Sequence, residues 1–167
     1  MKTLIVYYSL ENHVKQLCEK LAERSGADLL QLHTVKPYPS TGAAKFLVGG
    51  KSALAGETPK LQPYIFNAEK YGAVIFASPV WASTFTPPIR SFVEENRDRL
   101  KGKTLGSLLS YKGGGGDKAQ AKLREYLTGR KDGKLKAEAL ICEPNKKDPH
   151  TENAQKLDNL ARLIKTW

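Results

Sequence analysis

Three segments of the sequence combine residue types that could bind an anionic ligand with a flat ring. Each segment follows a short apolar run and precedes a helix-like pattern; they are residues 9–14, 79–84 and 111–117. In an open parallel α/β sheet, the loops that follow the strands meet at the carboxyl edge, and ligands bind where the strand order reverses. The sequence therefore predicts one site, assembled from three loops, for a flat cofactor that carries a phosphate.

The first segment has the chemistry of an anion site. A helix that starts near Asn12 would present free backbone N–H groups, which attract phosphate. Ser9 adds a hydroxyl, Asn12 tolerates left-handed backbone, and His13 can donate a hydrogen bond or carry a charge. An ordinary strand-to-helix turn with a Ser or Asn cap explains the same residues, so this loop alone leaves both interpretations open.

The second segment places a large aromatic residue, Trp81, just past a buried strand and before small residues. Trp81 could stack on a flat heteroaromatic ring, and the backbone N–H and C=O groups of residues 80–83 could contact the polar edge of that ring. The alternative is that Trp81 packs beneath the next helix.

The third segment contains four consecutive glycines at 113–116. Ordering such a run is entropically costly. It is useful where backbone approaches a ligand closely or where successive N–H groups form an anion nest. A flexible linker is the alternative, but the run lies directly between a buried strand and a helix. We therefore favour ligand contact.

Several familiar catalytic patterns are missing from the sequence. There is no GxGxxG after the first strand, no phosphate-binding GxxxxGK[ST] loop and no GxSxG elbow. His13, His33 and His150 lack metal-ligand spacing, and no pairing of a nucleophile with a base stands out. Any chemistry is therefore expected to belong to a bound cofactor.

The elements that must position these loops alternate regularly. Strands are predicted at 2–8, 28–34, 72–78, 103–110 and 135–142. Helices are predicted at 12–25, roughly 43–54, from Pro87 behind a Thr86 cap, at 117–128, and from Asp148-Pro149 onward with Ala154, Leu157, Leu160, Ala161 and Ile164 buried. This alternation indicates a doubly wound parallel α/β sheet. We expect a single domain over 1–167, with an irregular insertion at about 36–64.

Composition narrows the class of protein. The net charge of +10 favours anionic ligands or acidic partners. The sequence does not favour nucleic-acid binding, because no known module is present and acids alternate with the basic residues. Cys18 and Cys142 belong to no metal or disulfide pattern, and no run is apolar enough to span a membrane. A cytoplasmic protein without a signal peptide is expected, and its oligomeric state is left open.

The loop motifs resemble those of the flavodoxin family. The resemblance rests on Tyr7-Tyr8-Ser9-Leu10-Glu11-Asn12, on Ser78-Pro79-Val80-Trp81 with the residues up to Pro88, and on the glycine run. It is closest to bacterial flavodoxin-like proteins with the Ser-Pro-Val-Trp loop, which also share the pattern at 49–63. It implies a five-stranded parallel sheet of order 2-1-3-4-5 with helices on both faces, and flavin mononucleotide (FMN) as the cofactor.

The resemblance also assigns the cofactor-binding residues. Residues 9–14 would hold the phosphate, residues 79–84 would flank the isoalloxazine ring, and residues 111–117 would close the other side. The expected contacts are Ser9, Leu10, Glu11, Asn12, His13, Val14, Pro79, Val80, Trp81, Ala82, Ser83, Thr84, Tyr111, Gly113, Gly114, Gly115, Gly116 and Asp117.

The chain departs from the family pattern in the first loop. Many relatives carry a hydroxyl or a glycine at the positions of Glu11 and Asn12, and a threonine at that of Val14. Glu11 would repel a phosphate unless it points away, for example toward Lys15, and His13 could compensate as a donor. The basic charge is a second departure, because electron-carrier flavodoxins are acidic.

The resemblance implies electron or hydride transfer through FMN. The protein could be an enzyme that oxidises NAD(P)H and reduces a quinone-like acceptor, or a carrier between redox partner proteins. The alternative is a flavodoxin-fold binding module that has lost FMN and recruits an acidic partner through its basic surface.

Overall fold

The computed structural model describes residues 1–143 and 152–167. Five parallel strands form one sheet: β1 (Thr3–Tyr7), β2 (Asp28–Gln31), β3 (Ala73–Trp81), β5 (Thr104–Tyr111) and β6 (Ala137–Cys142). They lie in the order β2-β1-β3-β5-β6. This confirms the predicted order 2-1-3-4-5 of the parallel strands.

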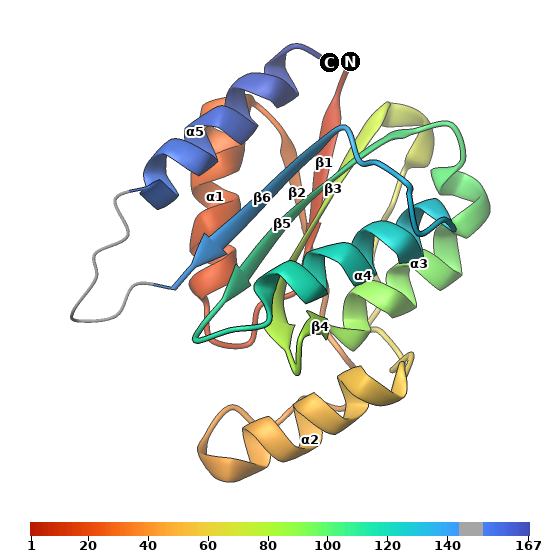
Figure 1. Cartoon of the computed structure of the whole chain (residues 1–167). Coiled ribbons are helices and arrows are strands. Elements are labelled where there is room, and N and C mark those ends of the chain that lie inside the picture. The colour runs from red at the N-terminus through yellow and green to blue at the C-terminus, as the bar shows by residue number, and fades with distance from the viewer. Residues whose placement is uncertain (144–151) are drawn as a thin grey trace.

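Helices cover both faces of the sheet (Figure 1). On one face, α1 (His13–Ser25) and α5 (Glu152–Lys165) bury Cys18 and Leu157 against the sheet. On the other, α3 (Pro87–Leu100) and α4 (Gly116–Thr128) bury Phe92 and Leu123. The central strand β3 is apolar throughout its first half because both of its faces are buried.

The helix ends follow the predicted signals with two exceptions. Gly26 ends α1 with a φ of 75°. Thr86 precedes the first turn of α3, but its hydroxyl pairs with the Ser78 hydroxyl at 2.9 Å and caps no helix N–H. In α5, the prediction that Ala154 is buried is wrong. Ala154 is exposed, because it lies before the stripe of residues that meets the sheet. The predicted start of that helix at Asp148-Pro149 lies outside the described residues.

The second loop is more regular than the sequence suggests. Strand β3 continues to Trp81 and pairs antiparallel with a two-residue strand, β4 (Thr84–Phe85). Ala82 and Ser83 form the tip of this hairpin with φ values of 49° and 57°. The sequence analysis placed these residues in a loop, because the turn lacks the Asn-Gly signal of such hairpins.

The irregular segment between β2 and β3 carries helix α2 (Gly42–Ala55), near the predicted 43–54, and a short 3₁₀ turn, η1 (Ala68–Lys70). In Figure 1, α2 (orange) lies beyond the carboxyl edge of the sheet, outside both helix layers. The Tyr38 hydroxyl and Ser52 Oγ are 2.7 Å apart and fasten α2 to the segment before it. Phe46 and Leu47 on this helix are 73% and 70% exposed.

Among the described residues, no helix has the length and apolar character needed to cross a membrane. The same residues contain no cluster of His, Cys, Asp and Glu suited to a metal ion.

Candidate functional site

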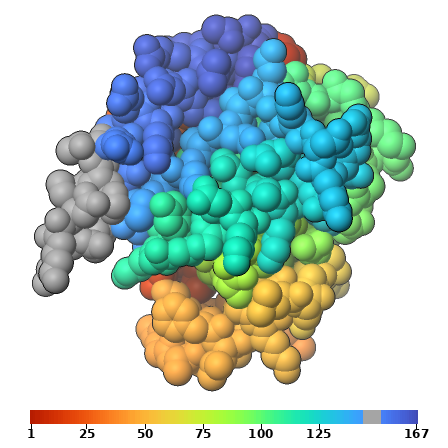
Figure 2. Space-filling model, viewed as in Figure 1, coloured from red at the N-terminus to blue at the C-terminus, as the bar shows by residue number. Residues whose placement is uncertain are grey.

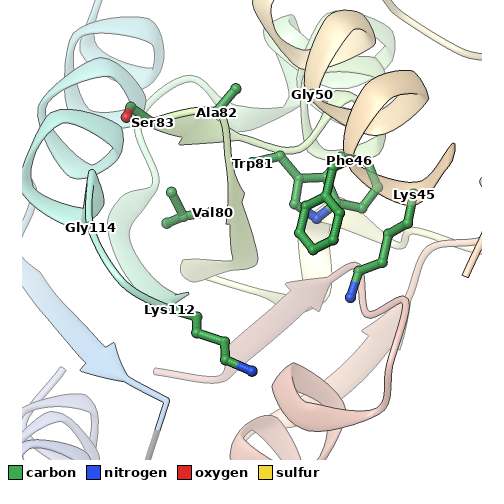
Figure 3. Close-up of a pocket in the computed structure, with 9 residues that line it drawn as sticks. All are labelled: Lys45, Phe46, Gly50, Val80, Trp81, Ala82, Ser83, Lys112 and Gly114. Atoms are coloured by element: carbon green, nitrogen blue, oxygen red, sulfur yellow. The ribbon is translucent and has the colours of Figure 1, made fainter. Parts of the chain in front are cut away.

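A cavity of about 360 Å³ opens at the carboxyl edge of the sheet, beside the point where the strand order reverses between β1 and β3. It is lined by Lys45, Phe46, Gly50, Val80, Trp81, Ala82, Ser83, Lys112 and Gly114. Figure 2 shows the hollow between α2 and the start of α4, and Figure 3 shows its lining residues. Its size lies within the range of about 300–1,000 Å³ that is usual for small-molecule sites.

One wall of the cavity is the tip of the β3–β4 hairpin. Both tip residues, Ala82 and Ser83, adopt left-handed backbone, which costs a residue with a Cβ roughly 1–2 kcal/mol. Unfavourable backbone of this kind persists where the surrounding structure imposes it, and it is concentrated at ligand sites. The tip is therefore held in a fixed shape facing the cavity.

Trp81 forms the apolar floor of the cavity and belongs to an aromatic cluster. Its ring meets those of Tyr8 and Tyr38 edge-on, with centroids 5.7 Å and 5.1 Å away. Gly49 of α2 lies over the indole, and a Cβ on this glycine would come within 3.1 Å of the ring. Trp81 thus packs beneath α2, not beneath the helix that follows it in sequence, and still lines the cavity.

The tyrosines of this cluster are held in their neutral form. Burial raises the pKa of Tyr8 well above its usual value, and burial is also the main cause of the raised pKa of Tyr38. Neither hydroxyl is therefore ionised near neutral pH, and the aromatic wall brings no negative charge to the cavity.

The glycine run of the third loop is shaped by contacts with the other loops. A Cβ on Gly115 would lie 2.3 Å from Ser83 Oγ, and Gly115 has a φ of 82°. A Cβ on Gly116 would come within 2.7 Å of the Tyr111 ring. Gly115 thus lets the third loop lie against the hairpin tip, Gly116 leaves room for the Tyr111 ring, and Gly114 lines the cavity directly.

The first loop has free donors at the start of α1. Asn12 adopts left-handed backbone with a φ of 63°, and Ser9 Oγ accepts a hydrogen bond from the Lys15 N–H at 3.1 Å. Within the described residues, the N–H groups at positions 10–14 donate to no protein acceptor, and the buried Nε2 of His13 has no partner. Such a set of unpaired donors suits a phosphate.

The acid in this loop is neutralised by a residue that the sequence analysis missed. Glu11 forms an ion pair with Lys45 of α2, and the predicted partner Lys15 was wrong. The Lys45 side chain is only 19% exposed and also lines the cavity. In Figure 3 it extends from α2 toward the first loop, and Lys112 approaches from the other side. No periodicity links residues 11 and 45; only the position of α2 brings them together.

The structure distributes the predicted site residues unevenly. Val80, Trp81, Ala82, Ser83 and Gly114 line the cavity. Thr84 lines a second cavity, together with residues of α3 and α4. The remaining predicted residues lie in the three loops or at the adjoining ends of strands and helices, outside the cavity lining: Ser9, Leu10, Glu11, Asn12, His13, Val14, Pro79, Tyr111, Gly113, Gly115, Gly116 and Asp117. Of these, Val14 belongs to α1 and is buried in the core.

The arrangement fits a flat ring joined to a phosphate. The cavity has an aromatic floor and backbone edges, two lysines supply positive charge, and the first loop offers unpaired N–H donors. Together with the doubly wound sheet, these features are typical of an α/β protein that binds a phosphate-bearing ring compound at its topological switch point.

The chain belongs to the flavodoxin family, whose model, described as Flavodoxin, matches residues 2–148. This confirms the family indicated by the loop motifs.

Solved structures share the fold over almost the whole chain. A flavoprotein from Lactobacillus acidophilus NCFM in complex with FMN is 16% identical, with a TM-score of 0.71 over 96% of this chain and 98% of its own. A candidate flavoprotein from Bacteroides eggerthii DSM 20697 is 22% identical, with the same TM-score and the same coverage of both chains. Two-electron reduced Megasphaera elsdenii flavodoxin is 14% identical, with a TM-score of 0.61 over 99% of both chains. At these identities the likeness establishes the fold.

Proposed function

We propose that this protein binds FMN in the cavity beneath α2 and transfers electrons through it, oxidising NAD(P)H and reducing a quinone-type acceptor. The observation that carries the proposal is the convergence of an aromatic-floored cavity with unpaired N–H donors at the first loop. Membership of the flavodoxin family and the FMN complex of the Lactobacillus relative support this cofactor.

Each loop has a distinct task in this proposal. The N–H groups at positions 10–14, with Lys45, would hold the phosphate. Trp81 would support the ring, and the backbone of 80–83 with Gly114 would face its edges. When bound, FMN supplies the one- and two-electron chemistry, and the protein sets its position and hydrogen bonding.

The basic charge supports an anionic electron donor. Lys45 and Lys112 face the cavity, and the chain carries a net charge of +10. A positive surface attracts anionic ligands and repels a basic reductase. A dinucleotide, which carries at least two phosphate charges, matches this field. A carrier role with an acidic redox partner would use the same field.

The first test is an absorption spectrum of the purified protein, before and after addition of excess FMN and desalting. We expect flavin bands at about one flavin per chain. The second test follows NAD(P)H consumption with a quinone and no added reductase. Steady NAD(P)H consumption supports an oxidoreductase. If an FMN-loaded sample consumes no NAD(P)H, only the role of an electron carrier is left.

A second candidate function is a binding module that has lost FMN, favoured by Glu11 in the phosphate loop and by Val14, which has no hydroxyl. Protein that stays colourless, with no quenching of added FMN fluorescence, would support this candidate and reject the first.

A further inference from the structure

A second cavity, of about 430 Å³, lies where β4, α3 and α4 meet. It is lined by Thr84, Phe85, Arg90, Lys122, Glu125, Tyr126 and Gly129, which belong to β4, α3 and α4 or follow the end of α4. The two cavities share no residue, but Ser83 of the first and Thr84 of the second are consecutive in the chain.

Arg90 is unusual among the arginines. In the described part of the chain, each of the other six donates a hydrogen bond to an oxygen atom: Arg24, Arg97, Arg99, Arg124, Arg130 and Arg162. Within the same residues, the side chains of Arg90 and Lys122 form no hydrogen bond and no ion pair. The cavity therefore has two cations whose charge the described residues do not pair.

The Arg90 guanidinium is nevertheless held in place. It lies over the rings of Tyr126 and Phe85, at 4.4 Å and 4.8 Å from their centroids. A Cβ on Gly56, at the end of α2, would be 3.7 Å from the guanidinium, which places the group between two elements. Contacts with ring faces leave free the N–H donors, which point outward in the guanidinium plane. This edge of the guanidinium is suited to a planar, two-point interaction with an oxyanion.

Neighbouring acids do not occupy this edge. Glu94, one turn after Arg90, accepts hydrogen bonds from Arg97 and from the Tyr126 hydroxyl. Glu125 lines the cavity and is exposed. The lining thus holds two cations and one carboxylate, a net charge of +1, which favours an anionic ligand.

We propose that Arg90 and Lys122 form a binding site for a phosphate monoester, the 2′-phosphate of a reduced dinucleotide, so that the protein prefers NADPH to NADH. This inference rests on the proposed function. A phosphate monoester carries about −1.5 to −2 charges at neutral pH, whereas each phosphate of a pyrophosphate bridge carries about one. The two linings meet in the chain at Ser83 and Thr84, which are consecutive. In the proposal, a dinucleotide with its nicotinamide over the first cavity extends past this point to place its 2′-phosphate at the second.

The test measures binding of fragments to FMN-saturated protein by titration calorimetry, with 2′,5′-ADP, 5′-AMP and inorganic phosphate as the probes. We expect 2′,5′-ADP to bind at least tenfold more tightly than either of the others. Arg90→Met should weaken 2′,5′-ADP at least tenfold, and Arg90→Lys should also weaken it, because the two-point geometry is lost. Arg97→Met is the matched control, because Arg97 contacts the same Tyr126 ring but is paired with Glu94.

Lys122→Gln guards against a folding defect, because Lys122 is exposed and pairs with none of the described residues. It should weaken 2′,5′-ADP at least threefold without changing the melting temperature. The same variants should lower the ratio of kcat/KM for NADPH to that for NADH, with NADH little affected.

Unchanged 2′,5′-ADP affinity in both Arg90→Met and Lys122→Gln would overturn the inference. So would 5′-AMP or inorganic phosphate binding as tightly as 2′,5′-ADP. A protein that accepts electrons from NADH and NADPH equally, in all variants, would reject this site and keep the proposed function. A protein that accepts them from neither would reject the NAD(P)H part of the proposed function, while the fragment titrations would still decide the phosphate site.

Discussion

Lys45 offers the sharpest test of how this chain binds a phosphate next to an acidic side chain. Its ammonium pairs with Glu11 in the first loop and lines the cavity. Lys45→Met would remove the charge and keep the length of a flexible apolar chain. We expect this variant to bind FMN more weakly and to leave Glu11 unpaired beside the phosphate.

The magnitude follows from the burial of the pair. The Lys45 side chain is 19% exposed, so its interaction with a phosphate is only partly screened. Losing a hydrogen bond to a charged group costs about 1.5–3 kcal/mol, or roughly ten- to a hundredfold in affinity. Glu11 is 56% exposed, so Glu11→Gln should improve FMN binding by no more than about 1 kcal/mol, roughly fivefold.

The assay is quenching of flavin fluorescence, with FMN and riboflavin titrated separately. Riboflavin lacks the phosphate, so Lys45→Met should change its affinity by less than about threefold. Lys51→Met is the matched control, because Lys51 lies on the same helix but is exposed and outside the cavity lining. It should leave both affinities unchanged.

Two results would refute this reasoning. If Lys45→Met weakens FMN and riboflavin equally, the lysine supports the ring or the position of α2 and does not act on the phosphate. If Glu11→Gln weakens FMN, the carboxylate itself contributes to the site and the ion pair does not merely neutralise it.

Four further predictions concern the same site and the sheet. Ser9→Ala should weaken FMN more than riboflavin in the fluorescence titration, because the hydroxyl lies in the phosphate loop and accepts the Lys15 N–H. Gly49→Ala should weaken FMN binding by about 0.5–1.5 kcal/mol, because the new Cβ would lie only 3.1 Å from the Trp81 ring and displace it. Ala82→Gly should raise the melting temperature by about 2 °C by relieving left-handed backbone. Asp28→Asn should destabilise the protein by about 1–2 kcal/mol at pH 7, because Asp28 accepts from Tyr71 and pairs with Lys2 and Lys70.

The pH dependence of the Asp28 effect has a definite sign. Hydrogen bonds from Lys70 and Tyr71 lower the pKa of this carboxyl well below its usual range. Its contribution is therefore present above the unfolded pKa of about 3.9 and is lost as the pH falls through the lower folded value. In denaturant unfolding, the difference in the free energy of unfolding between the wild type and Asp28→Asn should become smaller below pH 4. A difference that stays constant down to pH 2.5 would contradict the role of the Asp28 charge.

Each remaining prediction has its own contrary outcome. Equal losses of FMN and riboflavin in Ser9→Ala would place the phosphate elsewhere. Unchanged FMN affinity in Gly49→Ala would mean that the indole does not contact the ring of the cofactor. For Ala82→Gly, the exposed helical position Ala121 is the control: Ala121→Gly should lower stability by about 1 kcal/mol, and a loss of similar size in both would show that the hairpin tip is not strained.

The sheet could be predicted from sequence because each strand is apolar and ends in a turn signal. The 73–77 run is buried on both faces and could only be central. The β3–β4 hairpin could not be predicted, because Ala82 and Ser83 take positive φ without the glycine or asparagine that normally marks such a turn. Their shape is set by the neighbours packed around them: Gly50 on one side and Gly115 on the other.

The loops of the candidate site could be predicted from the polar segments that follow the strands. The part of the cavity lining that α2 supplies could not. Lys45 and Phe46 line the cavity from α2, which is apolar over most of its length and has no amphipathic stripe to orient it. Its place depends on the packing of Gly49 against Trp81 and on the contact between Tyr38 and Ser52. These pairs are distant in sequence, and no local pattern links them.

The position of α2 explains how the chain can carry Glu11 in a phosphate loop. An isolated carboxylate there would oppose the phosphate, and the N–H donors of the loop alone would have to offset it. Lys45 supplies a cation at that point from outside the loop, and Gly49, one turn further along the same helix, lets Trp81 pack beneath it. One helix thus links the charge balance of the phosphate end to the aromatic floor of the ring end. A substitution that shifts α2 should therefore disturb both ends together, whereas one that only changes the Lys45 charge should disturb the phosphate end alone.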